Sequence, residues 1–294
     1  MTNDFKASKG SYNKPQLTPE QWAEKKQQEK DAVYKLIDDT AVEVTSSPEK
    51  FKAFLDTQAR MDRYSAANAL LIYKQIPEAT QLKDFDDWTK EGVKINKGSK
   101  SISILEPVEY TKKDGTTGVS YNVKKVFDVS QTNGKRIPAP TLNRDPQKLV
   151  PMMLDSAPVA IESVSELPYN NMGALYDNDN QVILVKRGIG DSVAICQSVA
   201  QELGHAQLAV NSEAYSRKDC GFDAVCVGYM LCKKYGVDTQ NFNIQNLDNF
   251  KNKEPKAIRA ELTKVRGAMN EIHSRVSDEM YRKSQEKSKD LGAR

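Results

Sequence analysis

Residues 198–208 read SVAQELGHAQL, and this stretch differs at one position from a helical motif that binds zinc. The motif, His-Glu-x-x-His, places two imidazole ligands one helical turn apart and a glutamate beside them as general base. Glutamine stands at the first ligand position, Gln201, whereas Glu202 and His205 are present. On a helix, Gln201 and His205 project roughly 40° apart and away from the apolar stripe. The stretch therefore predicts a helix that carries a degenerate metal-binding face.

The first third of the chain shows helical periodicity with clear start signals. Thr18 followed by Pro19 indicates one helix start, and a Ser-Pro pair at Ser47 and a serine at Ser65 indicate two more. A short amphipathic piece, LKDFDDWTKEG, ends this region at a glycine. We expect three helices and one short helical segment here.

The pattern changes after this point. From Val93 to Thr132 apolar and polar residues alternate, and turn signals occur at Lys97-Gly98 and Asp114-Gly115. Alternation with period two and such turns predict strands joined by hairpins.

A second unit follows a proline-containing linker. The sequence predicts a strand near Ala160, a hairpin over GALYDNDNQVILVKRG, and helices over about 191–210, 219–235 and 254–287. Because 294 residues suffice for two cores, we expect two domains and an α+β fold. The expected division is a flexible tail at 1–16, a first domain at 17–136, a linker at 137–147 and a second domain at 148–294.

The charge is distributed unevenly. Between Trp88 and Arg136 there are ten Lys or Arg against five Asp or Glu, although the whole chain carries only +3. A basic segment in an otherwise balanced chain is typical of a protein that binds a polyanion.

Composition indicates a soluble protein of the cytoplasm. Charged residues make up 28% of the chain, the longest apolar run is too short to span a bilayer, and Met1 to Tyr12 lacks the apolar core of a signal peptide. We therefore expect no membrane partner. The four cysteines contain no Cys-x-x-Cys pair and lie in or beside apolar helical stretches, which predicts buried free thiols.

Several stretches in a fixed order resemble one protein family. They are RYSAANALLIYKQIPEAT, FDDWTKEGVKINKGSKSISILEP and VFDVSQT in the first half, and GALYDNDNQVILV, SVAQELGHAQL and FDAVCVGYMLCKKYGVDT in the second. From about Phe51 to Lys287 the chain resembles ArdC-type antirestriction proteins of mobile genetic elements. This resemblance implies an N-terminal single-stranded-DNA-binding domain of helices and an antiparallel sheet. It also implies a C-terminal domain with the zincin metallopeptidase fold and a long C-terminal helix.

The resemblance also implies a zinc ligand set that this chain lacks. The family carries histidine where this chain has Gln201 and a glutamate ligand where it has Val225. A neutral amide is a poor substitute for imidazole, and valine offers no lone pair. We therefore expect His205 to be a vestigial metal ligand, Glu202 a vestigial general base, and no cofactor to be bound. On the helical wheel, Asp223 points away from the Val225 face and Cys226 lies about 100° from it.

The first domain is expected to bind single-stranded DNA without sequence preference, through cations on phosphates and aromatic rings on bases. The candidates for phosphate contacts are Lys94, Lys97 and Lys100, and those for base or sugar contacts are Tyr64, Asn68, Trp88 and Tyr121. Phe85, Leu70, Leu71 and Phe127 are interpreted as core residues.

Two alternatives remain from the sequence. One is a zinc-dependent peptidase with non-standard ligands. The other is a protein-interaction module in which the cleft around His205 and Val225 holds a peptide partner without cutting it. Phe222, Val225, Tyr229 and Cys232 share one helical face, which is interpreted more simply as a packed core face.

Overall fold

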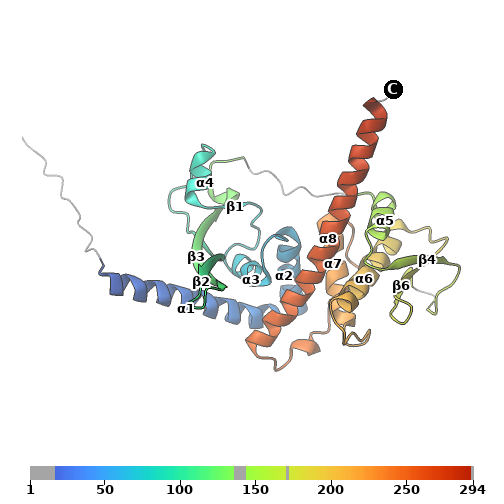
Figure 1. The fold of residues 1–294 in the computed structure, drawn as a ribbon, viewed down its shortest axis with the longest axis horizontal. Helices are drawn as coiled ribbons and strands as arrows, with labels where there is room; N and C mark the ends of the chain where they lie inside the picture. Colours follow the sequence, from blue (N-terminus) through green and yellow to red (C-terminus); the bar gives the residue numbers. More distant parts are fainter. Residues whose placement is uncertain (1–16, 136–143, 170–171, 293–294) are drawn as a thin grey trace, which may run out of the picture.

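A computed structural model describes residues 17–135, 144–169 and 172–292, and it shows two small sheets connected by helices (Figure 1). The helices are α1 (Pro19–Val44), α2 (Pro48–Arg60), α3 (Ala66–Gln75), α4 (Phe85–Lys90), α5 (Pro146–Asp155), α6 (Ser192–Val210), α7 (Gly221–Tyr235) and α8 (Pro255–Gly292). The strands are β1 (Leu82–Lys83), β2 (Ile102–Thr111), β3 (Thr117–Asp128), β4 (Ala160–Val164), β5 (Ala174–Asp177) and β6 (Val182–Lys186). Short 3-10 helices lie at Val129–Gln131 and Asp248–Phe250. The α+β class and the long C-terminal helix are confirmed.

The expected N-terminal helix starts are confirmed by their caps. The Thr18 hydroxyl accepts a hydrogen bond from the backbone N–H of Gln21, and the Gln21 side chain accepts one from the Thr18 N–H. Ser47 and Ser65 cap α2 and α3 in the same way, each accepting from an N–H three residues later. Local sequence therefore sets where these helices begin.

The first sheet is antiparallel, with strand order β1-β3-β2. The hairpin between β2 and β3 turns at Asp114-Gly115, as predicted, and Gly115 has a φ of 81°. The predicted hairpin at Lys97-Gly98 is wrong. Gly98 does form a turn with a φ of 88°, but the residues before it make only an isolated bridge, Ile95 to Thr132, instead of a strand.

The second sheet has the order β4-β6-β5, with β4 parallel and β5 antiparallel to β6. The strand near Ala160, the hairpin and the helices α6 and α7 lie where the sequence predicts them. Helix α5 was not anticipated. Its start, Asp145 followed by Pro146, is a capping signal that lay inside the predicted linker at 137–147, most of which falls outside the described residues. The predicted tail at 1–16 also falls outside them.

One hydrophobic cluster runs through both halves of the chain, from Val33 in α1 to Val276 in α8. The Phe51 ring of α2 lies 5.7 Å from the Phe222 ring of α7 and 5.3 Å from the Phe250 ring. Helix α8 packs against α1, α3, α6 and α7, so it joins the two halves (Figure 1). The four cysteines are buried and free, as expected. None of the described helices is apolar over a length that would cross a bilayer.

Candidate functional site

Glu202, the expected general base, lies on α6 and is fully engaged in the protein interior. Its carboxylate accepts two hydrogen bonds from Arg217, each 2.8 Å long, and a third of 2.7 Å from the backbone N–H of Tyr176. Only 2% of the Glu202 side chain is exposed. A carboxylate held by a bidentate guanidinium has its charge satisfied and its oxygens occupied. This geometry leaves Glu202 poorly placed to take a proton from water.

The same ion pair covers part of a sheet edge. β5 is the edge strand nearest α6, and Glu202 binds the N–H of Tyr176 in that strand. Arg217 Nη1 lies 3.4 Å from the carbonyl oxygen of Tyr176. Because both backbone groups of this residue are taken, an extended peptide cannot pair with β5 at this point.

His205 lies one turn beyond Gln201 on α6 and is also buried. Its Nδ1 is 2.9 Å from the hydroxyl of Tyr215. Burial, followed by the nearby Arg217 cation, lowers the pKa of His205 to about 3, so the ring is neutral near pH 7. A neutral imidazole could bind a metal, but it would need further ligands.

The residues present do not fit a zinc ion. Gln201 and Val225 stand at the two remaining positions, and Val225 packs against the hydrophobic core. Across the described part of the chain, no three His, Cys, Asp or Glu side chains are grouped so that they could hold a metal ion. The donor set is one imidazole beside a carboxylate that Arg217 already neutralises.

Three other side chains that could replace the missing zinc ligands are either buried or bound to other residues. Asp223 contacts Lys264 of α8 at 2.8 Å, which agrees with its expected direction away from the Val225 face. Cys226 is completely buried, and burial raises the pKa of its thiol. His273 binds the hydroxyl of Tyr235 through Nδ1 at 2.8 Å. None of these three side chains completes a ligand set with His205.

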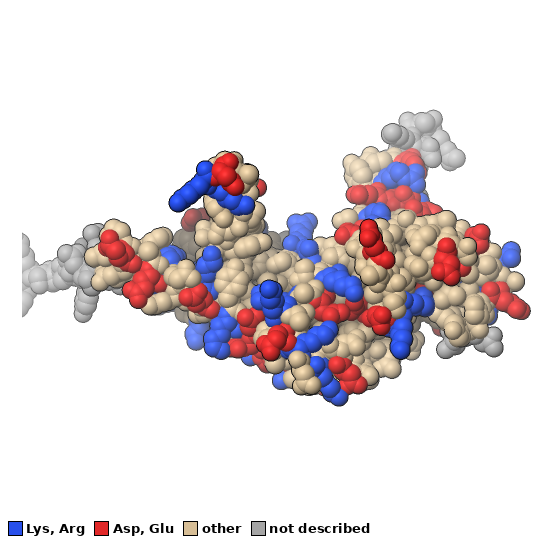
Figure 2. All heavy atoms as spheres, turned by 60° about the horizontal axis from the view of Figure 1, so that its bottom comes forward, with Lys and Arg blue, Asp and Glu red and all other residues tan. Residues whose placement is uncertain are grey.

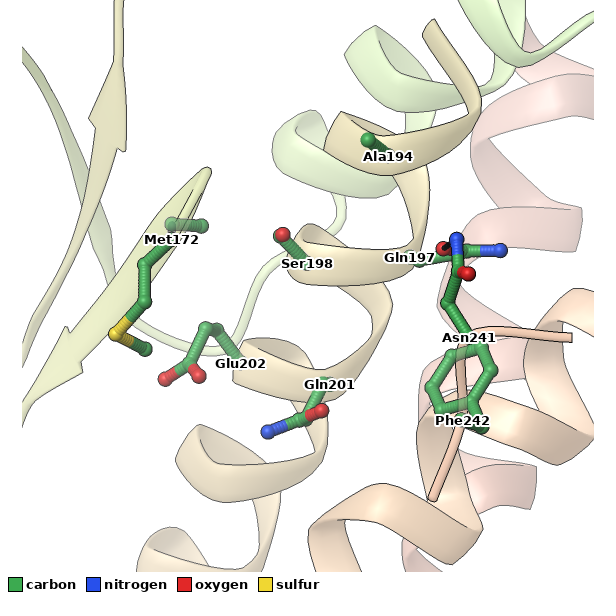
Figure 3. A pocket seen from close by; sticks show the side chains of 9 residues that line it. Met172, Ala194, Gln197, Ser198, Gln201, Glu202, Asn241 and Phe242 are labelled. Carbon is green, nitrogen blue, oxygen red and sulfur yellow. Dashed lines mark hydrogen bonds between the residues drawn. The ribbon is translucent and has the colours of Figure 1, made fainter. Parts of the chain in front are cut away.

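A cavity of about 450 Å³ opens beside α6. Figure 3 shows Glu202 on the sheet side of the helix, Gln201 below it, and Gln197 close to Asn241 on the opposite side. The amide oxygen of Gln197 accepts from Asn241 at 3.1 Å, and its amide nitrogen donates to the carbonyl of Asp238 at 2.6 Å. Three amides, Gln197, Gln201 and Asn241, therefore line this cleft, and only Gln201 stands at an expected zinc-ligand position; neither His205 nor Val225 lines it.

A second cavity, of about 480 Å³, lies in the N-terminal half, and we call it the tyrosine groove. It contains three of the predicted nucleic-acid contacts: Tyr64, Asn68 and Tyr121. It is lined by Arg63, Tyr64, Ser65, Asn68, Leu82, Lys83, Asp84, Asp87, Ile104, Leu105, Glu106, Pro107, Tyr121, Lys124, Val126 and Arg266. The structure thus brings together residues from the α2–α3 loop, β1, β2, β3 and α8.

Two of the predicted base contacts have structural roles. The Asn68 amide donates to the carbonyl of Leu105 at 2.8 Å and accepts from its N–H at 2.7 Å, so the side chain holds β2 against α3. Trp88 is only 2% exposed, and its indole N–H donates to the carbonyl of Phe127 at 3.0 Å. Trp88 is therefore buried outside the groove, and Asn68 lines the groove but is tied to the backbone of β2. Contact of either side chain with a base stays a prediction.

The prediction for Phe85 is wrong, because this side chain is exposed and not part of the core. It was interpreted as core but is 61% exposed, whereas Leu70 and Leu71 are buried as expected. Phe85 and Trp88 both lie on α4, and the face that packs against β3 is the one that carries Trp88.

The three predicted phosphate contacts do not line the tyrosine groove. Lys94, Lys97 and Lys100 are exposed residues of the segment between α4 and β2. Backbone hydrogen bonds hold this segment against residues 129–134, for example from Asn133 N–H to the Lys94 carbonyl at 2.9 Å. Figure 2 shows Lys and Arg interspersed with Asp and Glu on the face that it presents, without one continuous basic patch.

Sequence reasoning missed three arginines. Arg63 precedes Tyr64, and a cation next to an aromatic residue is a pattern that indicates a nucleic-acid contact. Arg217 and Arg266 are distant in sequence from the residues they meet, and no spacing rule connects them. These two are visible only in the folded chain.

Comparison with known proteins finds similarity both in the N-terminal segment and in the fold. Residues 26–139 match the family model described as the N-terminal domain of anti-restriction factor ArdC. The uncharacterized protein pXO2-81 of Bacillus anthracis is 23% identical over 332 aligned positions, which cover 91% of this chain and 55% of that protein. This chain therefore spans about half the length of that curated relative.

Among solved structures, the metal-free crystal structure of the antirestriction protein ArdC from plasmid R388 has a TM-score of 0.50 at 18% identity. The match covers 73% of this chain and 86% of that one, which shows a shared fold. The Mn(II)-bound structure of the same protein has a TM-score of 0.45 at 15% identity, covering 72% and 89%.

Proposed function

We propose that this chain, whose residues 26–139 match the family model described as the N-terminal domain of anti-restriction factor ArdC, binds single-stranded DNA without sequence preference. Its role would be to protect or accompany DNA that enters a cell with a mobile element, in the cytoplasm. The C-terminal part, with a zincin-like fold, would take part without hydrolysing peptide bonds.

The observation that carries this proposal is the composition of the tyrosine groove. Tyr64 and Tyr121 lie at a floor of apolar residues, and Arg63 lies beside them without a carboxylate within ion-pair distance in the described ranges. Unpaired bases stack on such rings, whereas the charges contact phosphates. Stacking is possible with every base, which gives affinity without sequence preference.

The experiment is a titration of labelled oligonucleotides at several salt concentrations. Replacing Tyr121 by alanine should lower affinity by about 1–3 kcal/mol for every sequence, because one stacked base is lost. Replacing Lys94, Lys97 and Lys100 together should reduce the slope of log K against log salt by about 2, if each contacts one phosphate.

Tyr281→Ala is the matched control, since Tyr281 is 68% exposed on α8 and lines none of the cavities described above. It should bind like the unaltered protein. Binding that does not depend on salt, or no binding at low salt, would contradict the proposal.

A zinc peptidase with non-standard ligands is the second candidate, and the cleft beside α6 is the feature that favours it. Its test is the metal content of the purified chain after dialysis against zinc. We expect no stoichiometric metal. One zinc per chain that disappears in His205→Ala, together with cleavage of a generic peptide substrate, would establish the peptidase instead.

A peptide-binding module without hydrolysis would use the same cleft. The volume of about 450 Å³ and the amide lining suit a short peptide, although Glu202 and Arg217 close the β5 edge at Tyr176. The cleft therefore offers side-chain contacts more than strand pairing.

A further inference from the structure

The tyrosine groove adjoins a cavity of about 600 Å³. The two cavities share Arg63, Tyr64, Leu82 and Lys83, so they lie side by side, and together we call them the track. The neighbouring cavity is also lined by Lys233 and Lys234 at the end of α7, and the tyrosine groove is also lined by Arg266 of α8. One wall of the track therefore comes from the N-terminal sheet and its helices, and the other from the C-terminal helices.

Resting on the proposed function, we infer that the C-terminal half completes the DNA-binding track and that the Arg266 guanidinium binds a phosphate of the strand. The base next to that phosphate stacks on the tyrosines. The inference concerns a binding residue outside the segment that matches the ArdC N-terminal domain, which ends at residue 139.

The guanidinium of Arg266 has only part of its hydrogen-bonding capacity used by the described residues. Its Nη2 donates to the backbone carbonyl of Asp62 at 3.0 Å, but its Nε is buried and has no hydrogen-bond partner among the described residues. No described carboxylate lies within ion-pair distance of it. Burial lowers the pKa of Arg266 in spite of the opposing effect of Asp62. The buried Nε is out of reach of a groove ligand, but the guanidinium as a whole is a partly buried cation without a carboxylate partner, and an anion in the groove stabilises such a cation.

The other cations of the track are paired with carboxylates, except Arg60, whose guanidinium donates to the backbone carbonyls of Ala79 and Pro77. Lys124 Nζ lies 3.2 Å from Asp84 and 2.8 Å from Glu106. Lys233 pairs with Asp56 at 3.2 Å, and Lys234 pairs with Asp62 at 3.0 Å. Lys83 pairs with Glu91, and Asp87 pairs with Lys90 at 2.9 Å. Arg63 and Arg266 are therefore the described groove cations with no carboxylate within ion-pair distance.

The walls between these arginines suit an unpaired base. Tyr121 is 42% exposed, and Tyr64 is half-buried beside it in the same groove. Leu82, Ile104 and Val126 form an apolar floor. A duplex keeps its bases stacked inside and would use only the cations, whereas a single strand uses the rings as well.

The test uses the full chain and a labelled oligothymidylate. Arg266→Met keeps the length of the side chain but removes its charge and donors. We expect the affinity at low salt to fall about tenfold, and the slope of log K against log salt to fall by about 0.7, the value for one phosphate contact on a single strand. Arg266→Lys, which keeps the charge, should keep the slope of the unaltered protein.

Arg259→Met is the matched control. Arg259 also lies on α8 and contacts the N-terminal half, through Asp38 at 2.8 Å, but it lines neither cavity of the track. Thermal unfolding of both variants measures any loss of contact between the halves. We expect Arg259→Met to bind like the unaltered protein.

The outcomes separate the two proposals. If the unaltered chain binds the oligonucleotide and Arg266→Met binds with the same affinity and slope, the inference fails while the proposed function stands. Equal weakening by Arg266→Met and Arg259→Met would also overturn it, because a general loss of structure would then explain both. If the unaltered chain does not bind at low salt, the proposed function itself fails.

Discussion

Three hydrogen bonds hold the carboxylate of Glu202, two from Arg217 and one from the backbone of Tyr176. This makes Glu202 a residue that fixes α6 to the sheet and to the loop before α7. A buried carboxylate is tolerated only when its charge is compensated. Arg217 supplies that compensation, and in doing so it removes the group that a hydrolytic site would need.

Replacing Arg217 by methionine should therefore lower the free energy of unfolding by about 3 kcal/mol, because it leaves a buried charge without its partner. The double variant Arg217→Met with Glu202→Gln should recover part of this loss, since a buried amide costs less than a buried carboxylate. Urea denaturation measures both. Arg282→Met, which breaks exposed ion pairs with Glu279 and Glu286, is the control and should change stability little. An effect of Arg217→Met no larger than that of the control would refute this role.

Helices α6 and α7 approach each other closely at two glycines. A Cβ on Gly228 of α7 would lie 3.0 Å from the backbone of Gln201 in α6, and one on Gly204 of α6 would lie 3.1 Å from the carbonyl oxygen of Ala224 in α7. Backbone atoms cannot move aside as a flexible side chain can. The two helices therefore depend on glycine for their packing, and this packing holds the cleft beside α6 in shape.

Gly228→Ala should destabilise the protein by about 1–3 kcal/mol, because the clash outweighs the higher helix propensity of alanine. Gly267→Ala in α8 is the matched control, since its Cβ would meet nothing within 4 Å. That change should raise stability by about 0.5–1 kcal/mol through helix propensity alone. Thermal unfolding of the two variants measures the difference, and a stabilised Gly228→Ala protein would show that the helices can separate freely.

At the scale of the whole molecule, the two halves share a core and a polar interface. The Asp62 carboxylate, just after α2, contacts Lys234 of α7 at 3.0 Å and His273 of α8 at 3.4 Å. Its backbone carbonyl accepts from Arg266 and from Asn270. These contacts fix α8 against the N-terminal sheet and its helices. Through these contacts a helix of the C-terminal half lines a groove in the N-terminal half. The division into two domains therefore stays a prediction.

Local features could be predicted because their causes are local. Caps at Thr18, Ser47 and Ser65 act within one turn, and a turn such as Asp114-Gly115 is specified by its own residues. The degenerate motif at Gln201 and Val225 stays a prediction, which rests on the resemblance for the ligand positions and on the weak donor capacity of an amide and the lack of any in valine. The sequence by itself thus determined the helices other than α5, the main hairpin and the α+β class.

Only the tertiary structure decided which side chains are exposed and which cations are paired. Trp88 and Phe85 lie on one short helix, and β3, far along the chain, decides that the tryptophan is buried and the phenylalanine exposed. Arg217 meets Glu202, and Arg266 meets Asp62, across long separations in sequence. Burial and charge pairing depend on which surfaces meet when the chain closes on itself, and no periodicity within a segment contains that information.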